Sequence, residues 1–214
     1  MTERIYSDLE SAGQELAVAL DKHRDSNSLV LAIANGGVPV AIPIAETLVA
    51  RLDLMVVRRL FMREGRTLPV SAVSVGGNLV IDSDSRTYSD AEEQFRQQAI
   101  QELSKRADEM RGDQKSREIA GQNLIVVDNG IHTGWTLQIV INALRKFRPQ
   151  SVTVAVPVAD VLVKSTIDSI ADEVVCLQWC ENFGNAARWY KSFERPSDEQ
   201  IRITFQTWRM INQA

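Results

Sequence analysis

The segment from Leu124 to Thr136, LIVVDNGIHTGWT, contains residue types that suit the binding of a sugar phosphate. A short apolar run ends at Asp128, and a turn with glycine and threonine leads into an amphipathic pattern that predicts a helix. The N-terminus of such a helix offers unpaired backbone N–H groups and the positive end of a dipole, which together favour a phosphate. Asp128, at the end of the predicted strand, is placed to accept hydrogen bonds from sugar hydroxyls. The segment therefore predicts a sugar-phosphate site.

The side chains of this loop narrow the chemistry further. Thr133 and Thr136 add hydroxyl donors, while Gly130 and Gly134 let the backbone approach a ligand closely. The loop matches neither GxxxxGK[ST] nor GxGxxG, so it is not a Walker loop or a dinucleotide-binding fingerprint. Histidine titrates near neutrality, but no orienting partner for His132 is visible, so we favour an electrostatic or packing role over acid–base catalysis.

The elements around this loop alternate between short apolar runs and amphipathic stretches. Continuous apolar runs rich in β-branched residues are typical of strands buried on both faces, and intervening helices make such a sheet parallel. The predicted fold class is α/β, with an open parallel sheet of about five strands flanked by helices. The predicted strands are 29–34, 54–58, 124–128, 152–156 and 174–177.

Three predicted helices begin at capping boxes, in which a serine is followed three residues later by glutamate or glutamine. These boxes start at Ser7, Ser89 and Ser197. The apolar face of the last helix is predicted to consist of Ile201, Phe205, Trp208 and Ile211.

Residues 61–115 interrupt the alternation of strands and helices. Apolar residues at 70–75 and 79–82 flank Gly76-Gly77-Asn78, which predicts an antiparallel hairpin, and a helical pattern follows. An insertion of this kind often covers a ligand site, so we expect 61–115 to form a hood within a single domain of residues 1–214. A surface hairpin without function is the alternative.

Composition limits the partners and the location of the chain. The 214 residues have a net charge of -4, which argues against a nucleic-acid-binding surface. The N-terminus lacks a secretion-signal pattern, and no apolar run reaches the ~20 residues that span a bilayer, so we expect a cytosolic protein without a membrane partner. The two cysteines and two histidines are not spaced as metal ligands, so we expect no metal centre built from this chain alone.

The loop closely resembles the phosphoribosyl diphosphate (PRPP) motif of type I phosphoribosyltransferases. In that motif an apolar strand leads into two acidic residues and a TGxT-like phosphate loop; here the first acid is Asp128 and the loop is Thr133–Thr136. Residues 31–41, LAIANGGVPVA, are similar to LAIPRGGVPVA in one branch of the family. The resemblance extends over most of the chain and implies the family's core sheet with a smaller hood.

The resemblance also implies an activity, which is the transfer of phosphoribose between PRPP and a nitrogenous base. Asp128 and Asn129 would be the catalytic pair, the ligand would bring Mg²⁺ on its pyrophosphate, and the protein would be a homodimer. The implied ribose and phosphate contacts are Asp128, Asn129, Gly130, Ile131, His132, Thr133, Gly134, Trp135 and Thr136. The implied pyrophosphate contacts are Asn35, Gly36, Gly37, Arg58 and Arg59.

Two asparagines depart from the family's pattern. Asn129 replaces the second acid, and Asn35 replaces an arginine of the related branch. A hydrogen bond to a charged group contributes roughly 1.5–3 kcal/mol, so the loss of one corresponds to a rate lower by about ten- to a hundredfold. Two functions therefore remain open. The chain is either an enzyme or a catalytically weak or inactive regulatory module that senses PRPP or a nucleoside monophosphate.

Aromatic residues near the site also allow more than one interpretation. Trp135 could leave the phosphate-binding amide undisturbed, stack on a ligand or fill the ribose site. A C-terminal group could form the base pocket, a dimer contact or a packed layer. This group consists of Trp179, Phe183, Trp189 and Tyr190.

Overall fold

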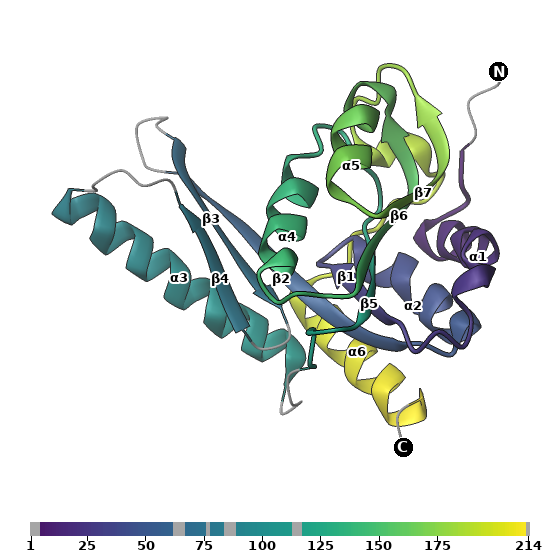
Figure 1. Ribbon diagram of the computed structural model, residues 1–214, viewed down its shortest axis with the longest axis horizontal. Helices are drawn as coiled ribbons and strands as arrows, with labels where there is room; N and C mark the ends of the chain where they lie inside the picture. Colours follow the sequence, from purple (N-terminus) through teal and green to yellow (C-terminus); the bar gives the residue numbers. More distant parts are fainter. Residues whose placement is uncertain (1–4, 62–66, 76–77, 84–88, 113–116, 213–214) are drawn as a thin grey trace.

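A computed structural model describes residues 5–61, 67–75, 78–83, 89–112 and 117–212, and within them the strands form one sheet (Figure 1). The strand order is β4-β3-β2-β1-β5-β6-β7. Strands β2, β1, β5, β6 and β7 are parallel to one another. Strand β3 pairs antiparallel with β2, and β4 pairs antiparallel with β3. The predicted α/β fold with a parallel core of about five strands is confirmed. The strand bounds are β1 Leu29–Ile33, β2 Arg51–Phe61, β3 Thr67–Val75, β4 Asn78–Ser83, β5 Asn123–Val127, β6 Ser151–Asp160 and β7 Glu173–Cys180.

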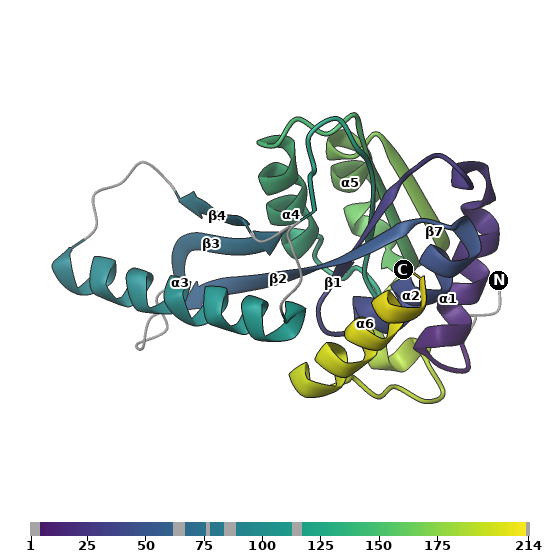
Figure 2. The same ribbon diagram turned by 90° about the horizontal axis from the view of Figure 1, so that it is seen from below.

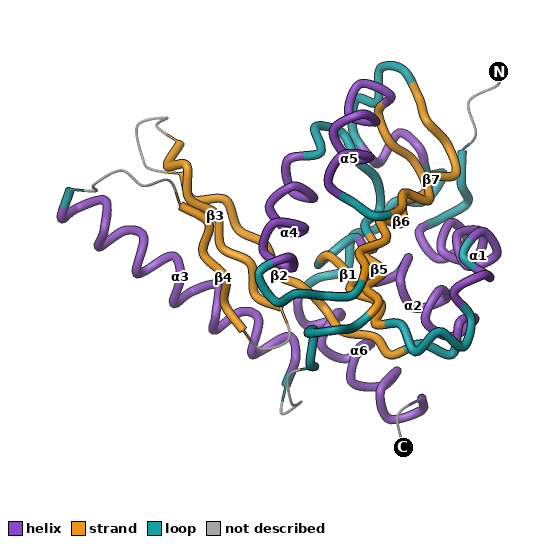
Figure 3. Tube along the Cα trace, viewed as in Figure 1, coloured by secondary structure: helices purple, strands orange, loops and turns teal. Residues whose placement is uncertain are grey.

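Helices cover both faces of the sheet, as Figure 3 shows. One apolar cluster joins the sheet to α1, α2, α3 and α6, and a second joins it to α4 and α5. Every residue of β1 is buried, because the strand lies in the middle of the sheet with helices on each side. Within the described residues, every helix is too short or too polar to span a lipid bilayer. The helix bounds are α1 Leu9–Ala19, α2 Gly37–Leu48, α3 Asp90–Arg111, α4 Trp135–Arg145, α5 Lys164–Ile170 and α6 Asp198–Asn212.

The hairpin predicted between the second core strand and the following helix is present as β3 and β4. It extends the core sheet, because β3 pairs antiparallel with the outer part of β2. The β3–β4 hairpin and α3 project together from one end of the molecule (Figure 2). Gly76 and Gly77 of the predicted turn lie outside the described residues.

A buried charged cluster attaches α3 and α6 to β2. The fully buried carboxylate of Asp53 lies 3.4 Å from Nε of Arg111 and 3.5 Å from Nη2 of Arg209. The same carboxylate accepts a hydrogen bond from the backbone N–H of Leu54 at 2.8 Å. One acidic group on the strand therefore holds a basic group from each of the two helices.

Two of the predicted helix details are wrong, and both errors have a local cause. The first helix is capped by Asp8 with Ser11 at the third position, not by Ser7, because aspartate accepts from the helix N–H groups as serine does. Ile211 is 74% exposed rather than buried, because it lies in the last turn of α6 beyond the buried part of that helix. The capping boxes at Ser89 and Ser197 are confirmed.

Candidate functional site

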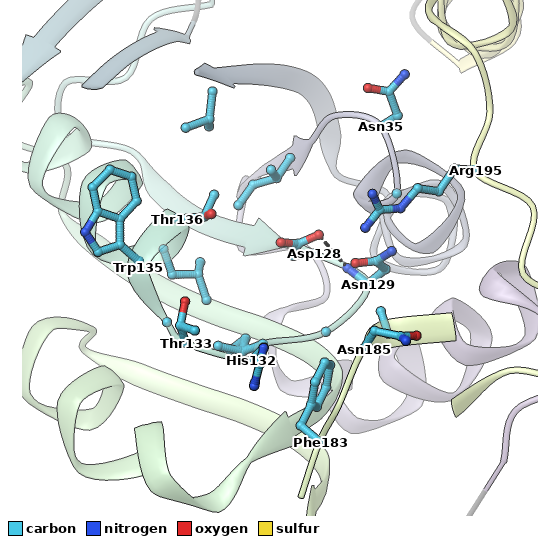
Figure 4. A pocket seen from close by; sticks show the side chains of 18 of the residues that line it. Asn35, Asp128, Asn129, His132, Thr133, Trp135, Thr136, Phe183, Asn185 and Arg195 are labelled. Atoms are coloured by element: carbon cyan, nitrogen blue, oxygen red, sulfur yellow. Dashed lines mark hydrogen bonds between the residues drawn. The ribbon is translucent and has the colours of Figure 1, made fainter. Parts of the chain in front are cut away.

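A cavity of about 500 Å³ lies at the carboxyl ends of β1 and β5 (Figure 4). Open α/β sheets bind ligands at this edge because the loops that leave neighbouring parallel strands diverge there. The end of β1 and the loop after it contribute residues 33–36, and the loop after β5 with the first turn of α4 contributes residues 128–137. Residues 183–186, Val57 of β2 and Arg195 complete the lining.

The loop after β5 ends at the exposed N-terminus of α4. Gly134, the residue before the helix, has a left-handed φ of 68°, which glycine adopts without strain, and no side chain caps the helix. Thr133, on the loop, and Thr136, in the first turn of α4, are both exposed. The start of α4 and the loop before it therefore present open N–H groups and two hydroxyls to the cavity, as a phosphate site requires.

Asp128 lies at the centre of the cavity with its carboxyl group half-buried. Its Oδ1 accepts a hydrogen bond from the backbone N–H of Asn129 at 2.7 Å. Burial raises the pKa of Asp128 to about 7, although this hydrogen bond and the nearby charge of Arg195 act in the opposite direction. Hydrogen-bond donors on a ligand would oppose this shift, because they stabilise the charged form of the carboxyl group.

Asn129 is almost completely buried beneath the loop after β1. Its side chain is 3% exposed, and its Nδ2 has no hydrogen-bond partner within the described residues. The backbone carbonyl oxygen of Asn129 accepts a hydrogen bond from the hydroxyl of Tyr190 at 2.6 Å. The loop fits closely above it: a Cβ atom on Gly36 would lie 2.3 Å from that Nδ2, and one on Gly37 would lie 2.6 Å from the carbonyl oxygen of Val127.

Asn35 stands at the edge of the cavity, but its amide is bonded to other parts of the protein. Nδ2 donates to the carbonyl oxygen of Pro196 at 2.9 Å and to Oδ1 of Asp198 at 2.7 Å. Oδ1 accepts from Nη2 of Arg106 at 2.8 Å. The side chain thus connects the loop after β1 with α3 and with the start of α6.

Arg58 and Arg59 lie on β2, where they pair in register with Ala72 and Ser71 of β3. The side chains of both arginines are outside the described part of the structure. The β2 residue that lines the cavity is Val57, immediately before them.

The aromatic group predicted near the site is largely a packed layer. Phe183 and Trp189 are almost fully buried, and the indole N–H of Trp189 donates to the carbonyl oxygen of Phe183 at 3.0 Å. The exposed ring of His132 stacks on Phe183, with the ring centroids 5.5 Å apart and the planes at 14°. This contact supports a packing role for His132. The half-buried Trp135 lines the cavity beside it.

Sequence reasoning did not identify Arg195 or the segment 184–186 as part of the site. These residues lie far beyond the loop after β5 in the sequence and belong to no motif that reports a ligand. They reach the cavity because Phe183 packs below the loop after β5. The chain then returns past it toward α6.

Comparisons with known proteins agree with this geometry. The family model for the phosphoribosyl transferase domain matches residues 2–190. The Mycobacterium tuberculosis protein Rv0571c, whose name assigns it to the phosphoribosyl transferases, is 30% identical over 202 residues, or 92% of this chain. That match covers 46% of Rv0571c, so the chain spans about half the length of the curated relatives it matches.

Solved structures share the fold of this chain. The crystal structure of TT1426 from Thermus thermophilus superposes with a TM-score of 0.80 at 28% identity, covering 95% of this chain and 99% of that one. A Neisseria gonorrhoeae protein solved with bound ppGpp shares the fold at 12% identity, with a TM-score of 0.50 and coverage of 97% and 98%. The match of the family model over residues 2–190 shows that the chain belongs to the phosphoribosyl transferase domain family.

Proposed function

We propose that this protein binds a 5-phosphoribosyl ligand and transfers phosphoribose between PRPP and a nitrogenous base. The observation that carries the proposal is that the uncapped N-terminus of α4 and the carboxyl group of Asp128 face one cavity. The helix N-terminus, with Thr133 and Thr136, would bind the 5-phosphate, and Asp128 would accept hydrogen bonds from the ribose hydroxyls. The amide groups of Gly36 and Gly37 would face the diphosphate.

In the proposed reaction a base nitrogen forms a bond to C1 of the ribose, while the bond from C1 to the diphosphate oxygen breaks. The electron pair of that bond leaves with the pyrophosphate, and the proton of the base nitrogen is released to the pyrophosphate or to water. Positive charge develops on the ribose in the transition state. Asp128 would stabilise this charge from the hydroxyl side. The remaining contribution of the protein is to position the reactants in a site that excludes water.

The residues of the cavity are compatible with Mg²⁺ that the ligand brings with it. Mg²⁺ is usually bound by one or two carboxylates together with substrate phosphates. Asp128 is the acidic residue among the described residues that line the cavity. When bound, the ion would neutralise charge on the diphosphate, with Asp128 as its contact on the protein.

A second candidate function is a module that binds the same ligand without turnover. The observation that favours it is Asn129, a neutral and almost completely buried residue that stands where the family's motif has a second acid. Such a module would sense PRPP or a nucleoside monophosphate.

Calorimetric titration distinguishes these proposals when it is combined with a turnover assay. The purified protein is titrated with Mg²⁺ and PRPP, with ribose 5-phosphate and with pyrophosphate, and pyrophosphate release is then followed with a panel of bases. PRPP binding with base-dependent release supports the enzyme, whereas binding without release supports the sensing module. Failure of all three ligands to bind would refute both.

A matched pair of variants shows whether binding takes place in this cavity. Thr136→Val removes one hydroxyl from the phosphate loop and is expected to weaken ribose 5-phosphate binding by about five- to tenfold. Thr166→Val removes an exposed hydroxyl from α5, away from the cavity, and is expected to leave binding unchanged.

Three further features are part of the proposal. The insertion 61–115 would cover the nitrogenous base as a hood, since Val57, on β2 just before the insertion, lines the cavity. The protein would be a cytosolic homodimer. Its mass in solution, measured by light scattering after gel filtration, tests the dimer, and fractionation of cells that express it tests the location.

A further inference from the structure

We propose that the side chain of Arg195 binds the diphosphate end of the bound molecule. We also propose that Asn35 positions Arg195 through its hydrogen bonds to Pro196 and Asp198. This inference rests on the proposed function, because it assigns a residue to one end of the same ligand.

Arg195 has the properties of an anion ligand that is not committed elsewhere. Its exposed guanidinium lines the cavity, lies near Asp128 and rests against the ring of Phe193, 5.6 Å from the ring centroid. It makes no hydrogen bond to any of the described residues. A guanidinium offers five N–H donors in a fixed plane, which suits two oxygens of one phosphate.

The position of Arg195 identifies the end of the ligand that it would meet. Figure 4 shows Asp128 between the phosphate loop, with Thr133 and Thr136, and the guanidinium of Arg195. A ribose at Asp128 with its 5-phosphate at α4 therefore directs its C1 substituent toward Arg195. The N-terminus of α2 is also at this side, because Gly36 lines the cavity and no side chain caps that helix.

The charges around the cavity support the same assignment. Of the described residues that line it, Arg195 is the one with a permanent positive charge. Arg106, the nearby basic residue on α3, is paired with Asp198 through contacts of 2.6 and 2.9 Å. This pair holds the pKa of Asp198 at about 2, so the carboxylate is ionised and balances Arg106 at neutral pH.

Asn35 is better suited to position Arg195 than to bind the ligand itself. An asparagine amide has two N–H donors, and those of Asn35 are used on Pro196 and Asp198. Its oxygen is used on Arg106, and an oxygen would in any case repel an anion. Because Pro196 follows Arg195 directly, these bonds fix the backbone next to Arg195 against the loop after β1.

The direct test is to titrate variants of Arg195 with pyrophosphate, with Mg²⁺ and PRPP, and with ribose 5-phosphate. Arg195→Gln is expected to weaken the binding of pyrophosphate and of PRPP by about ten- to a hundredfold, and that of ribose 5-phosphate by less than about twofold. Arg195→Lys should recover part of the loss, because it keeps the charge but not the planar fork. Lys191→Gln is the matched control, since it removes one charge from the same segment outside the cavity.

A double-mutant cycle tests the positioning role of Asn35. Asn35→Ala should weaken pyrophosphate binding in the wild-type background and have little effect in the Arg195→Gln background. Its effect on ribose 5-phosphate should be small in both. Equal losses for all ligands, or additive losses for pyrophosphate, would show that Asn35 does not act through Arg195.

The outcomes separate this inference from the proposed function. If wild-type protein binds PRPP and Arg195→Gln binds it equally well, the assignment of Arg195 is wrong and the function stands. If the wild type binds neither PRPP nor ribose 5-phosphate, the function fails; pyrophosphate binding that Arg195→Gln abolishes would still support the assignment. If the wild type binds neither PRPP nor pyrophosphate, the assignment of Arg195 is wrong. Thermal unfolding of each variant shows that losses do not come from unfolding.

Discussion

Gly36 lies so close to Asn129 that a single added carbon would collide with the buried amide. A Cβ atom at position 36 would lie 2.3 Å from Nδ2 of Asn129 and 2.8 Å from its Cγ. The φ angle of Gly36 is -70°, which any residue adopts, so the requirement for glycine comes from space alone. The loops after β1 and β5, which provide the two ends of the cavity, are therefore packed directly against each other.

Gly36→Ala is expected to destabilise the protein by about 1–3 kcal/mol, because overpacking a buried contact forces neighbouring groups to shift. The loop after β1 should move with it, so pyrophosphate binding should also weaken. Denaturant unfolding and calorimetry measure the two effects.

The control for this collision combines Gly36→Ala with Asn129→Ala. Asn129→Ala removes the amide that the new Cβ atom would meet, so the double variant should lose less stability than the sum of the two single variants. Strict additivity would mean that the two residues do not compete for this space.

Asp53→Asn is expected to cost about 3–5 kcal/mol in the free energy of unfolding, because it removes the buried negative charge that two buried arginines approach. Arg111 and Arg209 both approach this carboxylate within 3.5 Å. Asp21→Asn provides the comparison, since it breaks an exposed pair with Arg24 and should cost no more than about 1 kcal/mol. Similar losses for both variants in urea unfolding would contradict a structural role for the buried cluster.

The sequence was sufficient to predict the parallel core and the strand, turn and helix start around Asp128, because both depend on local patterns. Strand β1 is apolar throughout and β5 is apolar after Asn123. Asp128 to Thr136 contains the strand end, the turn and the helix start within nine residues. The register of the hairpin on β2 was not predictable, because it is set by pairing between segments far apart in the chain.

Arg195 and the bonds of Asn35 could not be predicted for a related physical reason. The partners of Asn35 are 71 to 163 positions away, and no periodicity links such positions. The cap at Asp8 shows a smaller ambiguity, in which two adjacent residues can both cap a helix and the backbone direction decides between them.

Tyr190→Phe is expected to destabilise the protein by about 1–2 kcal/mol and to weaken ligand binding as well. Its hydroxyl donates to the backbone carbonyl oxygen of Asn129 at 2.6 Å, near the start of the loop after β5. Burial raises the pKa of Tyr190, so the hydroxyl remains a donor throughout the neutral range.

Tyr6→Phe is the matched variant, because that hydroxyl also donates to a buried carbonyl oxygen, that of Pro157 at 2.9 Å. The loss of stability should be similar to that of Tyr190→Phe. The affinity for ribose 5-phosphate should not change, because neither Tyr6 nor its partner Pro157 lines the cavity, whereas Asn129 does. Equal effects of the two variants on affinity would show that the Tyr190 bond does not support the site.

The raised pKa of Asp128 predicts how stability depends on pH. The carboxyl group titrates at about 7 in the folded protein, against an ordinary value of 3.8. Between these values the folded chain holds a proton that the unfolded chain has lost, so this group makes the protein less stable as pH rises from about 4 to about 7. Below pH 4 both states are protonated and the contribution is constant.

Asp128→Asn removes this titration and isolates it from all others. The unfolding free energy of the variant minus that of the wild type, both without ligand, should increase steadily between pH 4 and pH 7 and level off above pH 7 to 8. The variant should therefore be at least as stable as the wild type at pH 8, while its affinity for ribose 5-phosphate falls, because a neutral amide replaces the carboxylate that would face the ribose hydroxyls. A difference independent of pH would show that Asp128 titrates at its ordinary value and that burial does not control its charge.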